Sequence, residues 1–152
     1  MNNIRKAILQ DLDALAHLFD GYRVFYKKGS DLMACKAFLT ERMTNKESEI
    51  FVSLNEEEII TGFVQLYPTF SSTRMKQLWI LNDLFVNPVY RGQGISKLLM
   101  EKAKELSLQS GSCGLLLDTA KTNTIGNKLY PSVGFVLNEA YNYYFWDARD
   151  FQ

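Results

Sequence analysis

The apolar positions along the N-terminal part of the chain predict one short strand followed by two helices. We expect Ile4–Ile8 to form the strand. Leucines and aromatic residues then recur at helical spacing over Leu12–Tyr22, and Asp11 is suited to be the N-cap of that helix. Lys27–Ser30 ends the helix. A second helix with a weaker apolar pattern is predicted over Leu32–Met43.

The middle of the chain has the pattern of an antiparallel sheet. Ile50–Leu54 and Ile59–Tyr67 read as two strands joined by the acidic turn Asn55–Glu57, which predicts a hairpin. We expect a polar loop over Pro68–Thr73. A long, largely apolar strand, Met75–Val86, should follow it and occupy the centre of the sheet.

The C-terminal half returns to alternating helices and strands. The first helix there has one apolar face and ends near Ser110–Gly111, where glycine suits a left-handed C-cap. That face contains Ile95, Leu98, Leu99, Ala103 and Leu106. The later elements are a buried strand, a short helix and two final strands: Leu115–Leu117, Ile125–Tyr130, Phe135–Leu137 and Tyr143–Trp146.

The resulting order, β-α-α-β-β-β-α-β-α-β-β, predicts an α/β (α+β) protein. Its mixed sheet should have about seven strands flanked by about four helices. The 152 residues suit one domain over the whole of 1–152, because no repeat or flexible linker divides them.

Composition narrows the function classes. Seventeen basic and seventeen acidic residues leave no net charge to attract nucleic acid. No apolar run approaches the ~18 residues of a membrane span, and the N-terminus is too short and polar for a signal peptide. Cys35 and Cys113 are far apart and form no metal-type spacing. We therefore expect reduced thiols, a cytoplasmic location and no metal.

The glycine-rich turn after the central strand is the strongest chemical signal. Arg91-Gly92-Gln93-Gly94 precedes a helix, whose N-terminal amides and dipole favour negative charge. Glycine permits close approach and Arg91 adds a cation, so the turn suits a pyrophosphate. A P-loop ending is missing. The chain also departs from the dinucleotide-binding fingerprint, because Lys97 occupies the position of the third glycine and only one βαβ unit is visible.

Two motifs resemble the GNAT superfamily of N-acetyltransferases. Arg91-x-x-Gly94-x-Ser96 is similar to its acyl-CoA-binding motif, and the second motif runs from Asn123 through Gly126 and Leu129-Tyr130 to Gly134-Phe135. Ser96 stands where the family usually has Gly or Ala, and Gly126 stands where it usually has Ala. Both residues are still small. The predicted order of elements is also the GNAT order.

This resemblance implies acetyl-CoA as co-substrate, with its pyrophosphate on the helix start and its pantetheine arm along the end of the central strand. For the side chains of Phe85 and Val86, plain core packing is the alternative, and for Asn123 it is helix capping. The implied cofactor-binding residues are Leu84, Phe85, Val86, Arg91, Gly92, Gln93, Gly94, Ile95, Ser96, Lys97, Asn123, Gly126 and Tyr130.

Two polar residues, Asn82 and Asp83, interrupt the apolar central strand and are costly if buried without partners. Either they face an acceptor pocket, where Asp83 attracts or deprotonates an amine, or they satisfy a β-bulge. Tyr22 and Tyr26 end the first helix and are candidates to hold a cationic amine by cation–π attraction. These four residues are the predicted substrate-binding set.

Asn82–Val86 resembles the histone/polyamine and spermidine/spermine acetyltransferases. Asn82 stands where the spermidine/spermine enzymes carry a Glu, and an amide cannot accept a proton. Asp83, directly or through water, is then the candidate base. Tyr130 matches the family tyrosine that protonates the leaving thiolate, with packing as its alternative role.

We therefore expect an N-acetyltransferase that acts on a small primary amine, such as a polyamine or amino acid. The alternatives are acetylation of protein lysines or N-termini, and a non-catalytic acyl-CoA sensor. The aromatic segment Tyr141–Trp146 predicts a homodimer, because an exposed strand of this kind would be a liability.

Overall fold

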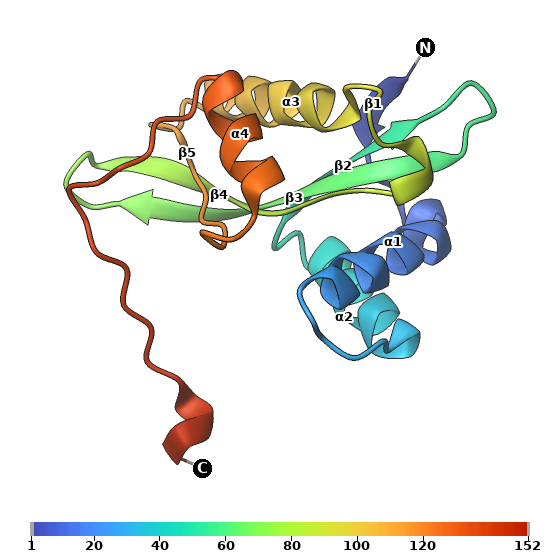
Figure 1. Ribbon diagram of the computed structural model, residues 1–152, viewed down its shortest axis with the longest axis horizontal. Helices are drawn as coiled ribbons and strands as arrows, with labels where there is room; N and C mark the ends of the chain where they lie inside the picture. The colour runs from blue at the N-terminus through green and yellow to red at the C-terminus, as the bar shows by residue number, and fades with distance from the viewer. Residues whose placement is uncertain (1, 152) are drawn as a thin grey trace. The chain divides into compact units, whose positions relative to one another are not determined.

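The computed structural model describes residues 2–151, which divide into two compact units. The first unit ends at Asp118 and the second begins at Thr119. The first contains β1 (Asn3–Lys6), α1 (Leu12–Phe25), α2 (Leu32–Thr44), β2 (Glu49–Leu54), β3 (Ile60–Ser71), β4 (Lys76–Val86), α3 (Ile95–Gln109) and β5 (Leu115–Leu116). The second contains α4 (Thr124–Ser132) and a helical turn at Ala148–Phe151. Figure 1 shows both along the chain.

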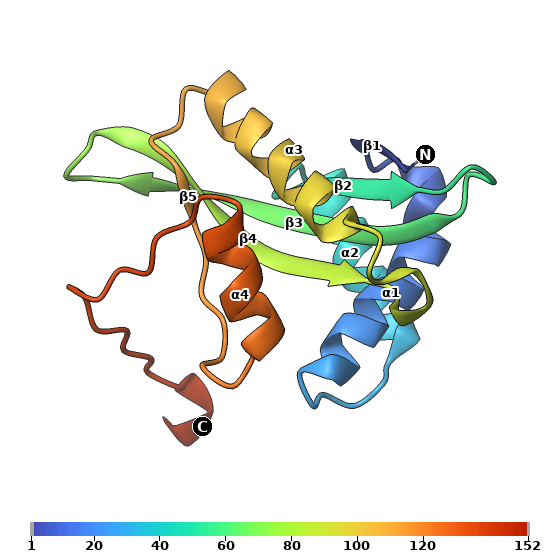
Figure 2. The same ribbon diagram turned by 45° about the horizontal axis from the view of Figure 1, so that its top comes forward.

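The five strands form one sheet in the order β1-β2-β3-β4-β5. The first four are antiparallel, and β5 pairs parallel to β4. Figure 2 shows β3 and β4 as the long central strands. The predicted mixed α/β class is therefore confirmed, although the sheet has fewer strands than the expected seven.

Helices cover both faces of this sheet. Helices α1 and α2 lie on one face and α3 lies on the other, as Figure 1 shows for the first unit. On the α1 side, Leu15 and Phe19 pack with Phe63 and Phe85 in the main apolar cluster. On the other side, Leu99, Met100 and Ala103 of α3 are fully buried. Burial of these apolar side chains is the main stabilising contribution.

The prediction of a polar loop over Pro68–Thr73 is wrong, because β3 continues to Ser71 and pairs with β4 as far as Lys76. The pairing of β2 with β3 ends at Leu66. Pro68 therefore lies where, within residues 2–151, β3 pairs with β4 alone. A proline, which has no N–H to donate, is tolerated at such an edge position.

The prediction of two final strands is also wrong. Phe135–Leu137 and Tyr143–Trp146 contain neither strand nor helix. A strand needs a neighbour to bond its backbone, and residues 2–151 supply none for these segments. Their side chains are mostly exposed, with Val136 at 90% and Tyr144 at 85%.

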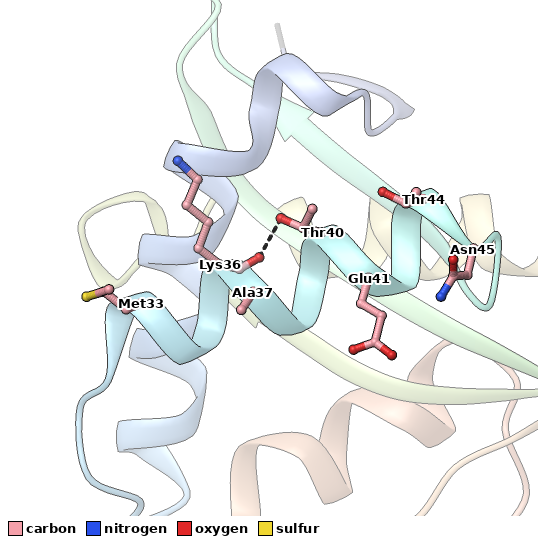
Figure 3. Close-up of a pocket in the computed structure, with 7 residues that line it drawn as sticks. All are labelled: Met33, Lys36, Ala37, Thr40, Glu41, Thr44 and Asn45. Atoms are coloured by element: carbon pink, nitrogen blue, oxygen red, sulfur yellow. Dashed lines mark hydrogen bonds between the residues drawn. The ribbon is translucent and has the colours of Figure 1, made fainter.

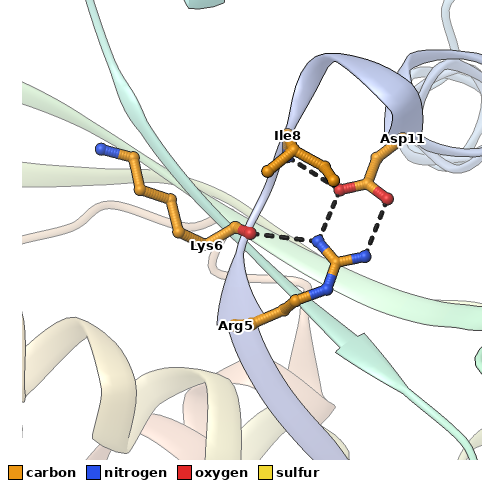
Figure 4. Close-up of polar contacts among 4 residues, drawn as sticks. All are labelled: Arg5, Lys6, Ile8 and Asp11. Carbon is orange, nitrogen blue, oxygen red and sulfur yellow. Dashed lines mark hydrogen bonds and ion pairs between the residues drawn. The ribbon is translucent and has the colours of Figure 1, made fainter.

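Asp11 precedes α1 as expected, but its side chain does not cap that helix. Its carboxylate instead binds Arg5 through two hydrogen bonds, Nη1 to Oδ2 at 2.7 Å and Nη2 to Oδ1 at 2.9 Å. The amide of Ile8 also donates to Oδ2 at 2.8 Å. Figure 4 shows how these bonds tie the end of β1 to the start of α1. Asp11 is buried, so the pair replaces water around its charge.

No helix among residues 2–151 is long and apolar enough to span a membrane.

We predict that Asp11→Asn lowers the free energy of unfolding at pH 7 by about 1–3 kcal/mol, because Arg5 then loses a charged, buried acceptor. The Arg5 hydrogen bond holds the pKa of Asp11 below its ordinary value, against the opposing effect of burial. The stabilisation is therefore present above the unfolded pKa of about 3.9 and is lost as the pH falls through the lower folded pKa. Urea denaturation over a pH series measures both effects.

Asp13→Asn is the matched control, because its ion pair with Lys36 lies on the surface and its side chain is 82% exposed. It should lower the free energy of unfolding much less than Asp11→Asn does, because water screens a surface ion pair. A difference between wild type and Asp11→Asn that stays constant down to about pH 2 would contradict the assignment.

Candidate functional site

The first turn of α3 presents bare backbone amides. Gly92 and Gly94 have φ angles of +80° and +76°, a region that favours glycine. Gly94 is the N-cap and supplies no capping side chain. Within residues 2–151, the amides of residues 92–97 donate no hydrogen bond, and a Cβ at either glycine would meet no atom. This open set of donors at the positive end of a helix suits a phosphate group.

Arg91 connects this loop to the end of β4. Its Nε donates to the carbonyl of Val86 at 3.0 Å, and its guanidinium lies 5.4 Å from the centroid of the Phe85 ring. The side chain remains exposed beside the loop. Its permanent charge therefore adds to that of the helix N-terminus.

Strand β4 has one open side next to this loop. It pairs with β3 along almost its whole length, but with β5 only at Trp79 and Ile80. From Leu81 to Val86, no other strand of the described residues pairs with that side. The predicted binding residues Leu84, Phe85 and Val86 lie in this open stretch. Backbone groups there are available to an extended ligand with amide groups.

Side chains of the same stretch serve the core. Phe85 is buried in the cluster with α1, and its ring would lie 3.3 Å from a Cβ placed on Gly21. Ile95, at the start of α3, is also buried, so its side chain belongs to the core. Ser96 is half-buried, whereas Gln93 and Lys97 are exposed.

A β-bulge lies at Asn82. Asp83 pairs with Gln65 and Leu81 with Leu66, so Asn82 is an extra residue in β4. The bulge turns Asn82 outward, where it is exposed, while Asp83 is only 2% exposed. The structure therefore shows the bulge that one interpretation of these polar residues predicts, and it makes Asp83 a buried carboxylate.

The Asp83 carboxylate accepts two amide hydrogen bonds. Gln65 Nε2 donates to Oδ2 at 2.6 Å, and Asn82 Nδ2 donates to Oδ1 at 2.9 Å. Burial raises the pKa of Asp83, while these hydrogen bonds and one from Tyr22 oppose the rise. Asp83 forms no ion pair within residues 2–151. A raised pKa and proximity to an exposed position are typical of a functional carboxyl group.

The predicted aromatic residues adjoin this carboxylate. The hydroxyl of Tyr22 donates to the carbonyl of Asn82 at 3.1 Å, and the Tyr22 and Tyr26 rings meet edge-to-face at 5.0 Å. Tyr26, Tyr22, Asn82 and Asp83 are thus contiguous. The structure brings all four predicted substrate-binding residues together.

Sequence reasoning missed Gln65 and Tyr67, which lie on the same face of β3. Gln65 is fully buried and binds Asp83 directly. Burial, together with the charge of Asp83, raises the pKa of Tyr67 to about 12. A sequence signal for Gln65 was present: like Asn82 and Asp83, it is a polar residue within an apolar strand.

In the second unit, α4 holds the remaining predicted residues. Asn123 is the N-cap, and its Oδ1 accepts from the amide of Gly126 at 3.1 Å. Its Nδ2 donates to Thr119 Oγ1 at 3.0 Å. A Cβ at Gly126 would lie 2.5 Å from that Nδ2, so glycine leaves room for the cap. The Tyr130 ring lies beside Phe135, with ring centroids 6.2 Å apart.

A shallow depression of about 630 Å³ runs along α2. Figure 3 shows its lining, which includes Met33, Lys36 and Glu41. None of the predicted site residues lines it. Among residues 2–151, no group of three or more acidic, His or Cys side chains is placed to hold a metal ion.

Comparison with known proteins agrees with this geometry. The sequence profile of the acetyltransferase (GNAT) domain matches residues 46–137. An uncharacterized N-acetyltransferase, YhfO of Bacillus subtilis (strain 168), is 43% identical over 142 residues, which are 93% of this chain and 95% of the relative. The thialysine N-epsilon-acetyltransferase of Bos taurus is 31% identical over 75 residues, 49% of this chain and 44% of that protein.

A crystal structure of a probable acetyltransferase superposes with a TM-score of 0.90 at 36% identity, covering 95% of this chain and 97% of that one. Profile, relatives and fold agree over most of the chain. The protein belongs to the GNAT family and is an acetyl-CoA-dependent N-acetyltransferase.

Proposed function

We propose that this enzyme acetylates the primary amine of a small cationic acceptor, a polyamine or an amino acid. The observation that carries the proposal is the buried Asp83 carboxylate, which forms no ion pair within residues 2–151. A buried charge without a counter-charge is costly, and an ammonium group would supply one. The neighbouring Tyr22 and Tyr26 rings add faces that attract cations.

The same proposal assigns the co-substrate to the two open features of the first unit. The amides of Gly92–Lys97 and the Arg91 guanidinium would hold the pyrophosphate, and the backbone of Leu84–Val86 would bond the pantetheine arm. The positive φ of both glycines and the empty space around them fit this use. The thioester of acetyl-CoA supplies the acetyl group and a thiolate leaving group.

Three groups would handle the protons and the developing charge. An alkyl ammonium has a pKa near ~10, so it must lose a proton before it attacks. Asp83 would accept that proton, directly or through water, while a backbone N–H of β4 holds the oxyanion. Tyr130 would protonate the leaving sulfur. Asn123 and Gly126 of the second unit are the other proposed cofactor-binding residues, and Asn123 is also the N-cap that fixes the start of α4.

The subgroup of the family to which this enzyme belongs is also part of the proposal. Asn82–Val86 resembles the histone/polyamine and spermidine/spermine acetyltransferases, and the similarity to an enzyme named for thialysine, a lysine analogue, supports an amine on a small molecule. The alternatives are acetylation of protein lysines or N-termini and a sensor that binds acyl-CoA without turnover.

We predict that the wild-type enzyme releases CoA thiol with polyamines or amino acids more rapidly than with lysine-containing peptides. Tyr130→Phe should lower kcat about 10²-fold or more, because the general acid is lost, without changing acetyl-CoA affinity by calorimetry. Tyr144→Phe, at a side chain that is 85% exposed, is the control. Release only with peptides would favour the protein-directed alternative. Binding without any release would favour the sensor.

We predict that Gly94→Ala weakens acetyl-CoA binding by about 5- to 30-fold, since an L-residue pays about 1–2 kcal/mol for the left-handed conformation that binding must restore. Gly111→Ala is the matched control. Gly111 has a similar φ of +67° at the opposite end of α3, with equally open space. Titration calorimetry measures both variants. Equal affinities in the two would contradict the assigned pyrophosphate site.

The single-domain, cytoplasmic and dimer expectations also stay proposals. The matched profile spans the boundary between the two units, which supports one domain. Cys35 and Cys113 are unbridged, which suits a reducing compartment. The aromatic segment Tyr141–Trp146 supports a homodimer, because all five of its aromatic side chains are at least 67% exposed.

We predict that light scattering coupled to size exclusion gives twice the 17.5 kDa mass of one chain at micromolar concentration. The double variant Tyr144→Ser, Phe145→Ser should be monomeric, because it removes apolar surface from the proposed interface. Leu108→Ser is the control: Leu108 is 81% exposed, but it lies on α3 in the first unit. A monomeric wild type would overturn the dimer.

A further inference from the structure

A line of hydrogen bonds crosses the strands beneath α1 and ends at the candidate base. The Ser48 hydroxyl donates to Gln65 Oε1 at 2.8 Å, and Gln65 Nε2 donates to Asp83 Oδ2 at 2.6 Å. Asn82 Nδ2 donates to the other carboxylate oxygen, Oδ1, at 2.9 Å. Each oxygen of the carboxylate therefore has its own amide donor.

The direction of this line is fixed by chemistry. Ser48 donates to the amide oxygen of Gln65, so the amide nitrogen must face Asp83, where only a donor is useful to a carboxylate. Gln65 is fully buried, and no water competes for its bond to Oδ2. Asn82 is exposed, so its bond to Oδ1 is open to exchange with an incoming group. The two oxygens thus differ in their donors: Oδ2 is held by the fully buried Gln65, whereas Oδ1 is held by the exposed Asn82.

We propose that Gln65, held by Ser48, is a positioning residue that anchors Asp83 Oδ2 inside the sheet and so directs Oδ1 toward the acceptor amine. This inference rests on the proposed function of Asp83. Without the anchor, the carboxylate is free to rotate about its side-chain torsions, and the amine meets it in fewer productive orientations.

The anchor also helps to keep Asp83 charged. Burial raises the pKa of this carboxyl group, and the hydrogen bonds from Gln65, Asn82 and Tyr22 oppose the rise. The ionisable groups that interact with Asp83 are Tyr22 on α1 and Tyr67 on β3. Arg42 on α2 and Glu47 after it act on Tyr67.

Tyr67 stays neutral, because its pKa is about 12. Arg42 and Glu47 form an ion pair with Nε and Oε2 2.5 Å apart, so their charges largely offset each other. Loss of the buried Gln65 donor should therefore be detectable as a change in the pKa of Asp83.

The test compares Gln65→Leu with the wild type in the full-length enzyme. The acidic limb of kcat/KM should move to higher pH by about one unit or more, because a donor to the charged form is lost. Ser48→Ala should move it in the same direction by less. Gln65→Glu should move it furthest, because two adjacent carboxylates share one proton. Gln109→Leu, at an exposed glutamine of α3, should leave it in place.

A second readout does not depend on turnover. The ¹³C signal of the Asp83 carboxyl group, titrated without co-substrate, should show the same order of shifts, while calorimetric acetyl-CoA affinity stays unchanged. A lower melting temperature with an unshifted titration in folded Gln65→Leu would show a merely structural role and overturn the proposal. Should that variant not fold, unshifted titrations in Ser48→Ala and Gln65→Glu would overturn it equally.

Asp83→Asn separates this inference from the proposed function. If Asp83→Asn loses kcat/KM while Gln65→Leu keeps the wild-type pH profile and titration, the positioning role alone is wrong. If Asp83→Asn keeps full activity, the role of Asp83 in the reaction falls, and the positioning role falls with it.

Discussion

One extra residue in β4 governs the arrangement of the site. In a regular strand, residues 79, 81, 83 and 85 would all face the same side of the sheet. The bulge at Asn82 breaks this alternation, because Leu81 pairs with Leu66 while Asp83 pairs with Gln65. Since neighbouring residues of β3 face opposite sides, Leu81 and Asp83 do so too. The chain thereby places apolar Leu81 on one side and a carboxylate beneath α1 on the other.

Pairing on the other side of β4 sets the second feature of the site. Contact with β5 is limited to Trp79 and Ile80, so the strand leaves its parallel neighbour before it reaches the bulge. The open stretch leads directly to Arg91 and the amides at the start of α3. Bulge, open edge and helix start thus follow one another within Leu81–Lys97, and the buried Asp83 carboxylate and the open amides of the glycine-rich loop are supported by the same strand.

Much of this was predictable from local patterns. The apolar run predicted the bounds of β4 to within one residue. The glycines predicted the start of α3, because a positive φ angle favours glycine and is therefore visible in the sequence. The cap at Asn123 agrees with the alternative interpretation of that residue, and Tyr22 lies beside Asn82 as an acceptor wall requires. What failed depends on non-local pairing. Whether Pro68 ends a strand depends on where β2 stops, and Tyr143–Trp146 has a strand-like pattern but no strand beside it. Gln65 was missed because its partner is fixed by register across two strands.

The order of strands in the sheet follows their order along the chain, β1-β2-β3-β4-β5. Each new strand therefore pairs with one that the ribosome has already made, and the cost of closing long loops stays low. Ser48, Gln65 and Asp83 all precede α3, so the hydrogen-bonded line that ends at the carboxylate is complete in sequence before α3 emerges. Vectorial synthesis thus favours assembly of the proposed acid–base residues ahead of the proposed coenzyme-binding loop.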